Sequence, residues 1–501
     1  MYMRPLVLPL LFLPGAAVAD VTPQDVWDNM MAGYGAFGFQ YDATLDQTGD
    51  TLIANDGVVS VTYPVIGGQM AINMPPMTLT ALGDGTVQIS MPATYIVTVN
   101  ADIPEEIEPI TVEVTIAQEG LNSIASGDPG DVTYTTSASG LDMLINNMTV
   151  PDNSFDVFDM QFEGEGYDSV SRITVAEAVT ITNNVDNASS VTTINIDVDG
   201  FKQETVSRTG KVATTFAAEM PGNTDIMNLA PALRSGLSIV GTTQTEGGTS
   251  ETKSFDGDTV LSTQNQTSGP STASFGLDQS GIRFEGIAGA GQFTMDGAEM
   301  GLPFPIEMAF GAITGKFAFP LLASEDAQDF AYGFSVKDLA VADDIWNLID
   351  AGQGLDRSPV NLALDLTGEL TNSLDLVDPA TWEQINNGVV PVAPMSIAIN
   401  DLSLGALGAA AMASGAFTFD NDDLATFGGI PRPEGKASAQ ATGLNAAIDQ
   451  LIATGLVPEQ EMMVPRMFMG MFAVAQGDDE LTTELEINGE GHVILNGQRI
   501  Q

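Results

Sequence analysis

Histidine and cysteine, on which much acid–base and nucleophilic chemistry depends, are almost missing from this chain. The sequence has 501 residues, with one histidine (His492) and no cysteine. This composition argues against thiol nucleophiles, thiolate metal sites and His-ligated zinc. A Ser-His-Asp hydrolase would need His492 as its base, and no G-x-S-x-G motif accompanies that residue. The sequence therefore predicts a protein that is not an enzyme and uses no cofactor.

Carboxylates are abundant, with 66 Asp and Glu against 15 Lys and Arg. The stretch Asn195-x-Asp197-x-Asp199-Gly200 resembles the start of a calcium-binding loop, but Val206 stands where the loop needs a bidentate Glu. We interpret this stretch as a β-turn after a strand, with a weak calcium site as the alternative. Among so many acids no glycosidase pair can be recognised by spacing, so a carboxylate-based hydrolase is the least favoured function.

Methionine is the residue type whose clustering best suggests a binding surface. Five of the 23 methionines fall within residues 461–472. Flexible thioethers suit surfaces that accept irregular apolar ligands, including acyl chains, and the alternative is ordinary packing of a helix against a sheet. The candidate apolar-ligand surface consists of Met462, Met463, Met467, Phe468, Met469 and Met471.

The first residues are typical of a secretory signal peptide. Arg4 precedes an apolar run over residues 6–13, and Ala17-Val18-Ala19 fits the small-x-small cleavage pattern. We expect residues 1–19 to be removed by cleavage after Ala19, and no later segment is predicted to span a membrane. The predicted location is the periplasm, with secretion or display at the cell surface as the alternative.

The formal net charge of −51 restricts the possible partners. Nucleic acid is excluded as a predicted partner, because no basic patch is available to release its counterions. Direct docking on anionic lipid headgroups is disfavoured for the same reason. A chain of this length can bury enough apolar surface to fold without disulfides, so the lack of cysteine is compatible with export.

Period-two alternation of apolar and polar residues dominates the chain and predicts antiparallel strands. Val59-x-Val61-x-Tyr63 and Val112-x-Val114-x-Ile116 are examples, separated by turns rich in Gly, Asn and Asp. The predicted fold class is α+β and β-rich, with large twisted antiparallel sheets and a few short amphipathic helices packed on one face.

Helices are expected at a few places along this β-rich chain. Thr22 with Pro23 predicts the start of the first helix, which ends near Gly33. Further helices are predicted over residues 343–351, 445–454 and 459–475. A boundary near residue 270 would divide the mature chain into an N-terminal β-rich subdomain, 20–270, and a C-terminal α+β subdomain, 271–501.

The C-terminal third carries short motifs that resemble a known family. They are Gly443-Leu444 before the 448–456 helix, and the closing Leu485-x-Ile487-Asn488-Gly489-x-Gly491-x-Val493-x-Leu495-Asn496-Gly497. Over about 394–500 the chain resembles the bacterial envelope family of the domain of unknown function 2125 type. More distantly, its layout is similar to AsmA-like envelope proteins, whose long sheets are implicated in lipid transport and outer-membrane homeostasis. This chain departs from those proteins because no retained membrane anchor is predicted. The resemblance implies no catalytic residues.

Together these observations predict an exported, non-enzymatic periplasmic protein that is associated with the cell envelope. Its expected partner is a lipid or another apolar ligand held along the sheet, or an envelope protein. A structural or adhesive cell-surface protein is the alternative.

Overall fold

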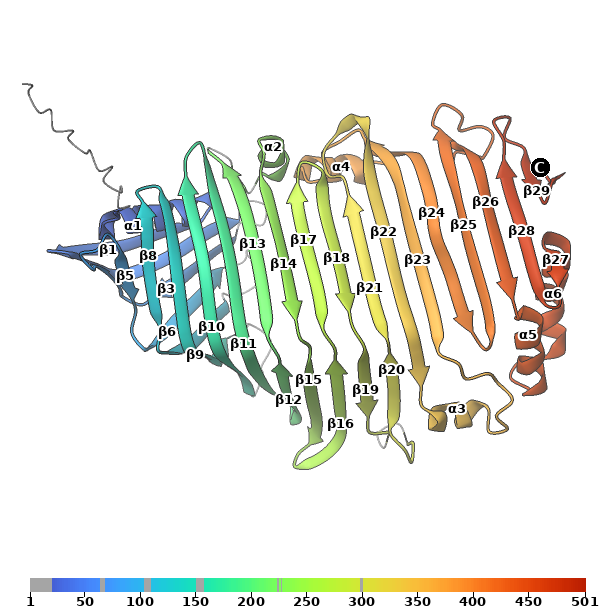
Figure 1. Cartoon of the computed structure of the whole chain (residues 1–501), viewed down its shortest axis with the longest axis horizontal. Coiled ribbons are helices and arrows are strands. Elements are labelled where there is room, and N and C mark those ends of the chain that lie inside the picture. Colours follow the sequence, from blue (N-terminus) through green and yellow to red (C-terminus); the bar gives the residue numbers. More distant parts are fainter. Residues whose placement is uncertain are drawn as a thin grey trace, which may run out of the picture.

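The computed structural model describes residues 20–63, 68–102, 110–149, 157–222, 225–226, 228–297 and 301–501. Within them, 30 strands form one hydrogen-bonded antiparallel sheet, and six short helices lie at its ends and edges (Figure 1). The predicted signal peptide, residues 1–19, lies outside the described residues. This architecture confirms the predicted β-rich α+β fold.

The helices of the described residues are six to 14 residues long. They are α1 (Pro23–Ala36), α2 (Leu229–Arg234), α3 (Asp343–Ile349), α4 (Pro379–Asn386), α5 (Leu444–Ala453) and α6 (Glu459–Phe472). The strands of the first half are β1 (Gln40–Thr48), β2 (Thr51–Tyr63), β3 (Gly68–Met74), β4 (Met77–Ala81), β5 (Val87–Ser90), β6 (Thr94–Asp102), β7 (Ile110–Glu119), β8 (Asn122–Asp128), β9 (Asp131–Thr149), β10 (Val157–Val175), β11 (Ala178–Val198), β12 (Phe201–Thr209), β13 (Val212–Pro221), β14 (Ser238–Thr245) and β15 (Gly248–Asp256). Those of the second half are β16 (Thr259–Ser268), β17 (Ser271–Asp278), β18 (Gly281–Ala288), β19 (Gly291–Met295), β20 (Ile306–Phe310), β21 (Ala312–Phe319), β22 (Ser324–Val341), β23 (Val360–Asn372), β24 (Val392–Ala406), β25 (Ala409–Asp420), β26 (Arg432–Thr442), β27 (Val474–Gly477), β28 (Glu480–Ile487), β29 (Val493–Leu495) and β30 (Gln498–Arg499).

Helix α1 begins where the sequence predicts it. The Thr22 side chain accepts a hydrogen bond from the Asp25 backbone N–H, and Asp25 accepts one from the Thr22 N–H at 2.9 Å, which is a complete capping box. Pro23 occupies the first turn, where its missing N–H costs nothing. The helix continues to Ala36, one turn beyond the predicted end at Gly33.

A meander of long strands builds the sheet, and many of these strands are broken in the middle. For example, β12 and β13 run end to end along β11, and β14 and β15 run end to end beside them. The breaks lie side by side: the Gly210 N–H donates to the Gly247 carbonyl at 2.9 Å, and the Gly269 N–H donates to the Ala290 carbonyl at 2.7 Å. We call this line of breaks across the sheet the crease.

At β22 the crease shifts the alternation of side chains by one residue. In the unbroken strand β22 the shift is a bulge at Asp338, whose φ is 54°. On either side of the bulge, Val336 lies opposite Leu362 and Leu339 lies opposite Val360. Leu362 and Val360 are two residues apart on β23 and share a face, so Val336 and Leu339 share that face as well. In β22 and β23 these apolar side chains therefore stay on one face across the crease.

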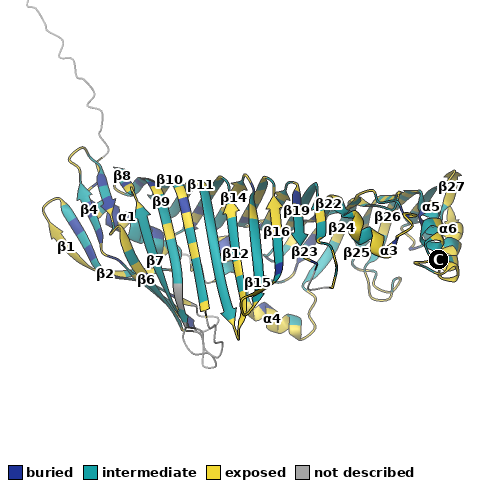
Figure 2. Cartoon of the chain, turned by 90° about the horizontal axis from the view of Figure 1, so that it is seen from below, coloured by how far each residue is buried: buried dark blue, intermediate teal, exposed yellow. Residues whose placement is uncertain are grey.

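Buried residues concentrate at the N-terminal end, where the sheet curls around α1 (Figure 2). Helix α1 contacts β1, β2, β4, β9, β10 and β11. Its Val26 and Trp27 pack in one core with Leu52, Leu79 and Val132 from the strands. This burial is the main source of stability at that end, because the hydrophobic effect scales with the apolar area removed from water. A second, smaller core forms beneath α2 around its Leu233.

The structure also bears on the predicted domain boundary and on the expectation that no helix spans a membrane. The proposed boundary near residue 270 falls between β16 and β17, and hydrogen-bonded pairing continues on both sides of it, with β14 against β17 and β16 against β19. The division into two subdomains stays a prediction. None of the helices in the described part of the chain has the length and apolarity that crossing a membrane requires.

Candidate functional site

A row of aromatic residues crosses the middle of the sheet. Each residue in the row lies directly opposite the next one on the neighbouring strand, so all share one face. The row runs Phe216, Gly241, Phe275, Phe284, Phe317, Tyr332, Leu366 and Ile399. We call Phe216, Phe275, Phe284, Phe317 and Tyr332 the aromatic row, the side of the sheet that carries them the apolar face, and the opposite side the polar face.

Four residues of the aromatic row are open to solvent, whereas Phe216 packs against the core beneath α2. Phe275, Phe284 and Phe317 are 42%, 47% and 41% exposed. In Figure 1 the described helices lie at the upper and lower edges and at the two ends of the sheet, and none covers its middle. The chain exposes 28379 Å² in total, compared with about 18,000 Å² for a compact monomer of this mass. Large aromatic side chains left open in this way mark a surface that binds something.

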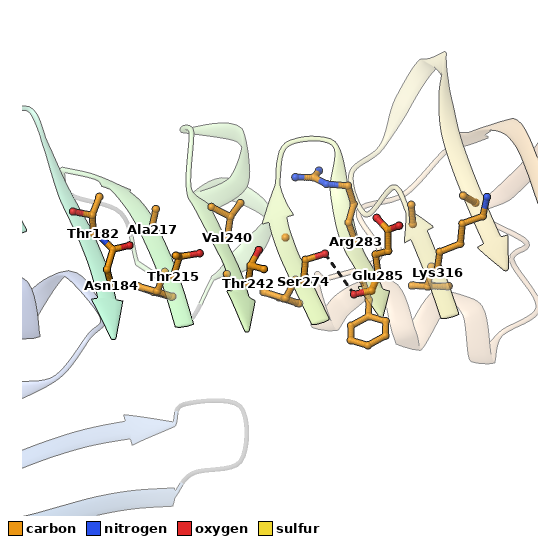
Figure 3. Close-up of a pocket in the computed structure, with 18 residues that line it drawn as sticks. Thr182, Asn184, Thr215, Ala217, Val240, Thr242, Ser274, Arg283, Glu285 and Lys316 are labelled. Carbon is orange, nitrogen blue, oxygen red and sulfur yellow. Dashed lines mark hydrogen bonds between the residues drawn. The ribbon is translucent and has the colours of Figure 1, made fainter. Parts of the chain in front are cut away.

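The polar face carries a different row at the same strands. Thr215, Thr242, Ser274, Glu285 and Lys316 are successive cross-strand partners and line a shallow hollow of about 740 Å³ (Figure 3). Its cations are paired within the chain. Lys316 donates to Asp365 at 2.7 Å, and Arg283 donates to both Asp278 oxygens, at 2.9 and 2.6 Å. The Arg283 hydrogen bonds hold the pKa of Asp278 well below its usual range. This face is therefore hydroxyl-rich and solvated.

The predicted methionine surface forms most of α6, at the C-terminal end of the sheet. Met463, Met467, Phe468 and Met471 are exposed, whereas Met462 and Met469 are half-buried. Of the six, Met469 lines a hollow of about 350 Å³ on the apolar face, together with Leu402, Leu404 and Leu481. The structure thus joins one predicted residue to the apolar face and leaves four on the outer side of the helix. Their role in ligand binding stays a prediction.

The N-terminal end of the apolar face forms a larger hollow beneath α1, which we call the α1 hollow. It measures about 740 Å³, and its lining includes Met30, Tyr34, Met77, Tyr134 and Asn183. Asn183 lies directly opposite Phe216, so the aromatic row leads into this hollow. An apolar cavity of this size with a few polar groups has the typical character of a small-molecule site.

The tyrosines of α1 and of the strands beneath it have raised pKa values. Burial raises the pKa of Tyr34 and of Tyr134, and burial together with the neighbouring Tyr34 raises the pKa of Tyr41 to about 12. The Tyr134 hydroxyl donates to Asn29 Oδ1 at 2.7 Å. Removing these phenols from water penalises the charged phenolate, so in the folded protein they ionise only at a pH above their ordinary range.

This burial predicts loss of stability at alkaline pH. In the unfolded chain these tyrosines ionise near pH ~10, whereas folded Tyr41 ionises at a pKa of about 12. Between these values only the unfolded state gains from ionisation, so stability is complete below pH ~10 and falls as pH rises through this window. Urea midpoints across the window, followed with tyrosinate absorbance, measure the effect. The Tyr41→Phe protein should lose less stability, and a flat wild-type midpoint would contradict the prediction.

The first candidates for catalysis and for calcium binding, His492 and the stretch 195–200, lie away from the apolar face. His492 Nδ1 lies 3.3 Å from Glu490 Oε2 in the closing hairpin. The calcium-like stretch forms a two-residue turn at Asp199 and Gly200, with φ of 54° and 83°, which confirms the interpretation as a turn. No group of three or more potential metal ligands occurs in the ranges that the structure describes.

Sequence reasoning did not identify the aromatic row. Its signal is weak, because Phe284 and Phe317 each belong to a short alternating run that resembles any half-buried strand. Only the strand register brings them side by side. Scans against protein-family models, curated sequences and solved structures find no match to this chain.

Proposed function

We propose that this chain is an exported, non-enzymatic protein of the bacterial periplasm that holds a lipid or another extended apolar ligand along its apolar face. The observation that carries the proposal is the exposed aromatic row on one face of a sheet whose other face is hydroxyl-rich. The predicted signal peptide and the envelope-family resemblance support the location. The single histidine and the lack of cysteine support a binding role.

The dimensions of the apolar face suit a long ligand. Between β13 and β24 the aromatic row and its continuation cross β14, β17, β18, β21, β22 and β23, which makes seven inter-strand steps. At about 4.8 Å per step this is about 34 Å. The hydrocarbon core of a whole bilayer is about 30 Å thick, so one acyl chain would cover roughly half of the row. Hollows at both ends of the face extend this apolar surface further.

Native mass spectrometry with lipid extraction tests the proposal, using protein expressed with its own signal peptide in a Gram-negative host. We expect a stoichiometric lipid on the wild-type protein and its loss in Phe284→Glu, because the carboxylate would place a charge in the middle of the apolar face. Ile287→Glu is the matched control, since Ile287 is on the same strand, 50% exposed and on the polar face. A ligand-free wild-type protein, or equal loss in both variants, would refute the proposal.

The alternative function, a structural or adhesive protein, would place the chain on the cell surface and not in the periplasm. A periplasmic protein is shielded from protease added to whole cells, whereas a surface protein is cleaved. Shielding in intact cells and cleavage after outer-membrane permeabilisation are the expected results. Cleavage in intact cells would favour the cell-surface alternative.

A further inference from the structure

The polar groups that line the α1 hollow are uncharged hydroxyls and an amide, and their free hydrogen-bond donors indicate the kind of ligand that the hollow binds. Ser171, Asn183 and Phe216 are successive cross-strand partners, so Ser171 and Asn183 lie where the aromatic row enters the hollow. The Ser171 hydroxyl donates to Asn183 Oδ1 at 2.9 Å, and this bond orients the amide. The Asn183 Nδ2 group then donates to no described residue, nor does the Tyr34 hydroxyl on the facing helix.

Most other polar groups of the hollow form hydrogen bonds within the protein. Ser123 and Thr136 hydroxyls lie 2.8 Å apart, and Tyr134 donates to Asn29, which in turn donates to the Ile173 carbonyl at 3.1 Å. Buried or half-buried donors without a partner are unfavourable unless water or a ligand supplies an acceptor. Asn183 Nδ2 and Tyr34 Oη belong to half-buried residues at the hollow, and each is free to donate to the acceptor oxygen of a ligand.

The charge of the hollow determines which oxygen is acceptable. No Lys, Arg, Asp or Glu lines it among the described residues, and its tyrosines are uncharged at neutral pH. A carboxylate or phosphate would enter without a counter-cation, inside a chain with a formal charge of −51. Two neutral donors offset only part of the cost of burying an anion. An ester, ketone or hydroxyl oxygen gains the same hydrogen bonds without that cost.

We propose that the α1 hollow binds the uncharged, oxygen-bearing end of an apolar ligand, with Asn183 and Tyr34 as the hydrogen-bond donors. This inference rests on the proposed function and specifies its ligand class: a neutral lipid that carries an ester, ketone or hydroxyl group, with its hydrocarbon part lying toward the aromatic row. A volume of about 740 Å³ accommodates such a group together with the adjoining part of its chain.

Three probes with the same hydrocarbon chain test the proposal on the delipidated full-length protein. They are methyl hexadecanoate, hexadecanoate at a pH where it is ionised, and hexadecane, each competing with an environment-sensitive fluorescent probe. We expect the methyl ester to bind at least about tenfold more tightly than either of the others, which is the ratio that one well-made hydrogen bond supplies. Equal binding of ester and carboxylate would overturn the inference and leave the proposed function standing.

The donors are tested by substitution. Tyr34→Phe removes one hydroxyl with little change of shape, and Asn183→Leu removes the other donor. Each should bring the affinity for the ester toward that for hexadecane while leaving hexadecane binding unchanged. Asn184→Leu is the control, because Asn184 neighbours Asn183 in sequence but lies on the polar face. An unchanged ester preference in Tyr34→Phe and Asn183→Leu would overturn the inference. If none of the probes binds the wild-type protein, the proposed function itself fails.

Discussion

The Gly247→Ala protein is expected to lose about 2–5 kcal/mol of unfolding free energy, which is the sum of a backbone and a packing effect. Gly247 has a φ of 98°, which L-residues rarely adopt, and a Cβ atom at this position would lie 2.1 Å from the Ser268 carbonyl oxygen. The obstructing atom belongs to the backbone of the neighbouring strand, so the clash cannot be relieved by rotating a side chain. The strands must separate at the crease instead.

Substitutions at two other glycines distinguish the cost of the positive φ from the cost of the clash. Gly257 has a φ of 58°, and no atom lies within 4 Å of the place that an added methyl group would take, so Gly257→Ala should cost only the backbone part, about 1–2 kcal/mol. Gly315 has no positive φ and open space around it, so Gly315→Ala should be close to neutral. Urea unfolding and hydrogen exchange of the strands beside the crease measure the differences. Equal effects for Gly247→Ala and Gly257→Ala would show that the crease tolerates a side chain.

The Trp27→Ala protein is expected to lose about 3–5 kcal/mol, the usual cost of truncating a large buried aromatic residue. Trp27 is 6% exposed and packs in the core that joins α1 to the sheet, with its ring centroid 5.3 Å from that of Tyr41. Because α1 contacts strands from β1 to β11, loss of this anchor should loosen the curled end of the sheet and the α1 hollow together.

Trp382 provides the matched control. It lies on α4 and is 58% exposed, so Trp382→Ala should change the stability by less than about 0.5 kcal/mol. Urea unfolding followed by fluorescence of the remaining tryptophans, with circular dichroism as a second probe, measures both variants. Similar midpoints for the two variants would mean that α1 is not an essential part of the core.

Local signals in the sequence correctly predicted helices α1, α3, α5 and α6 and the turn at Asp199-Gly200, whereas α4 was not predicted. The capping pattern at Thr22 located α1, and Asp199-Gly200 gave the hairpin between β11 and β12. The stretch Asn55-Asp56-Gly57 has the residue types of a hairpin turn, but β2 continues through it, and the chain turns earlier, between Thr48 and Thr51. Asp56 does adopt a positive φ of 52°. That conformation serves a turn in one context and an irregular strand in another, and the sequence does not distinguish them.

The crease could not be predicted either, because its local sequence pattern also occurs in ordinary turns and linkers. Gly269-Pro270 lies between two polar-apolar alternating runs, a pattern that normally predicts a turn or a linker. The chain continues past it as a collinear strand, because β16 and β17 each pair with strands that are broken at the same level. Only these long-range pairings make the break part of a strand. The one-residue shift in alternation is visible in the sequence, but it becomes informative only once the register is known.

The candidate site shows the same division between local and non-local information. A cluster such as Met462 to Met471 is conspicuous because its members are adjacent in the chain. The aromatic row brings together Phe216 and Tyr332, which are more than a hundred positions apart, so no window of sequence contains it. The sequence pattern predicted a strand-rich chain and the helix at the C-terminal end of the apolar face. It did not predict which residues the strand register brings together in the aromatic row.

The meander of strands also determines how this protein can fold. Each long strand, whole or broken at the crease, pairs with the strands just before and just after it in the chain. Each new strand therefore closes only a short loop, and the loss of chain entropy at each step is small. This favours rapid formation of the sheet from one end. The core around α1 is complete once β11 has paired, and the rest of the sheet can then add strand by strand as the chain emerges, with the last strand formed as the growing edge.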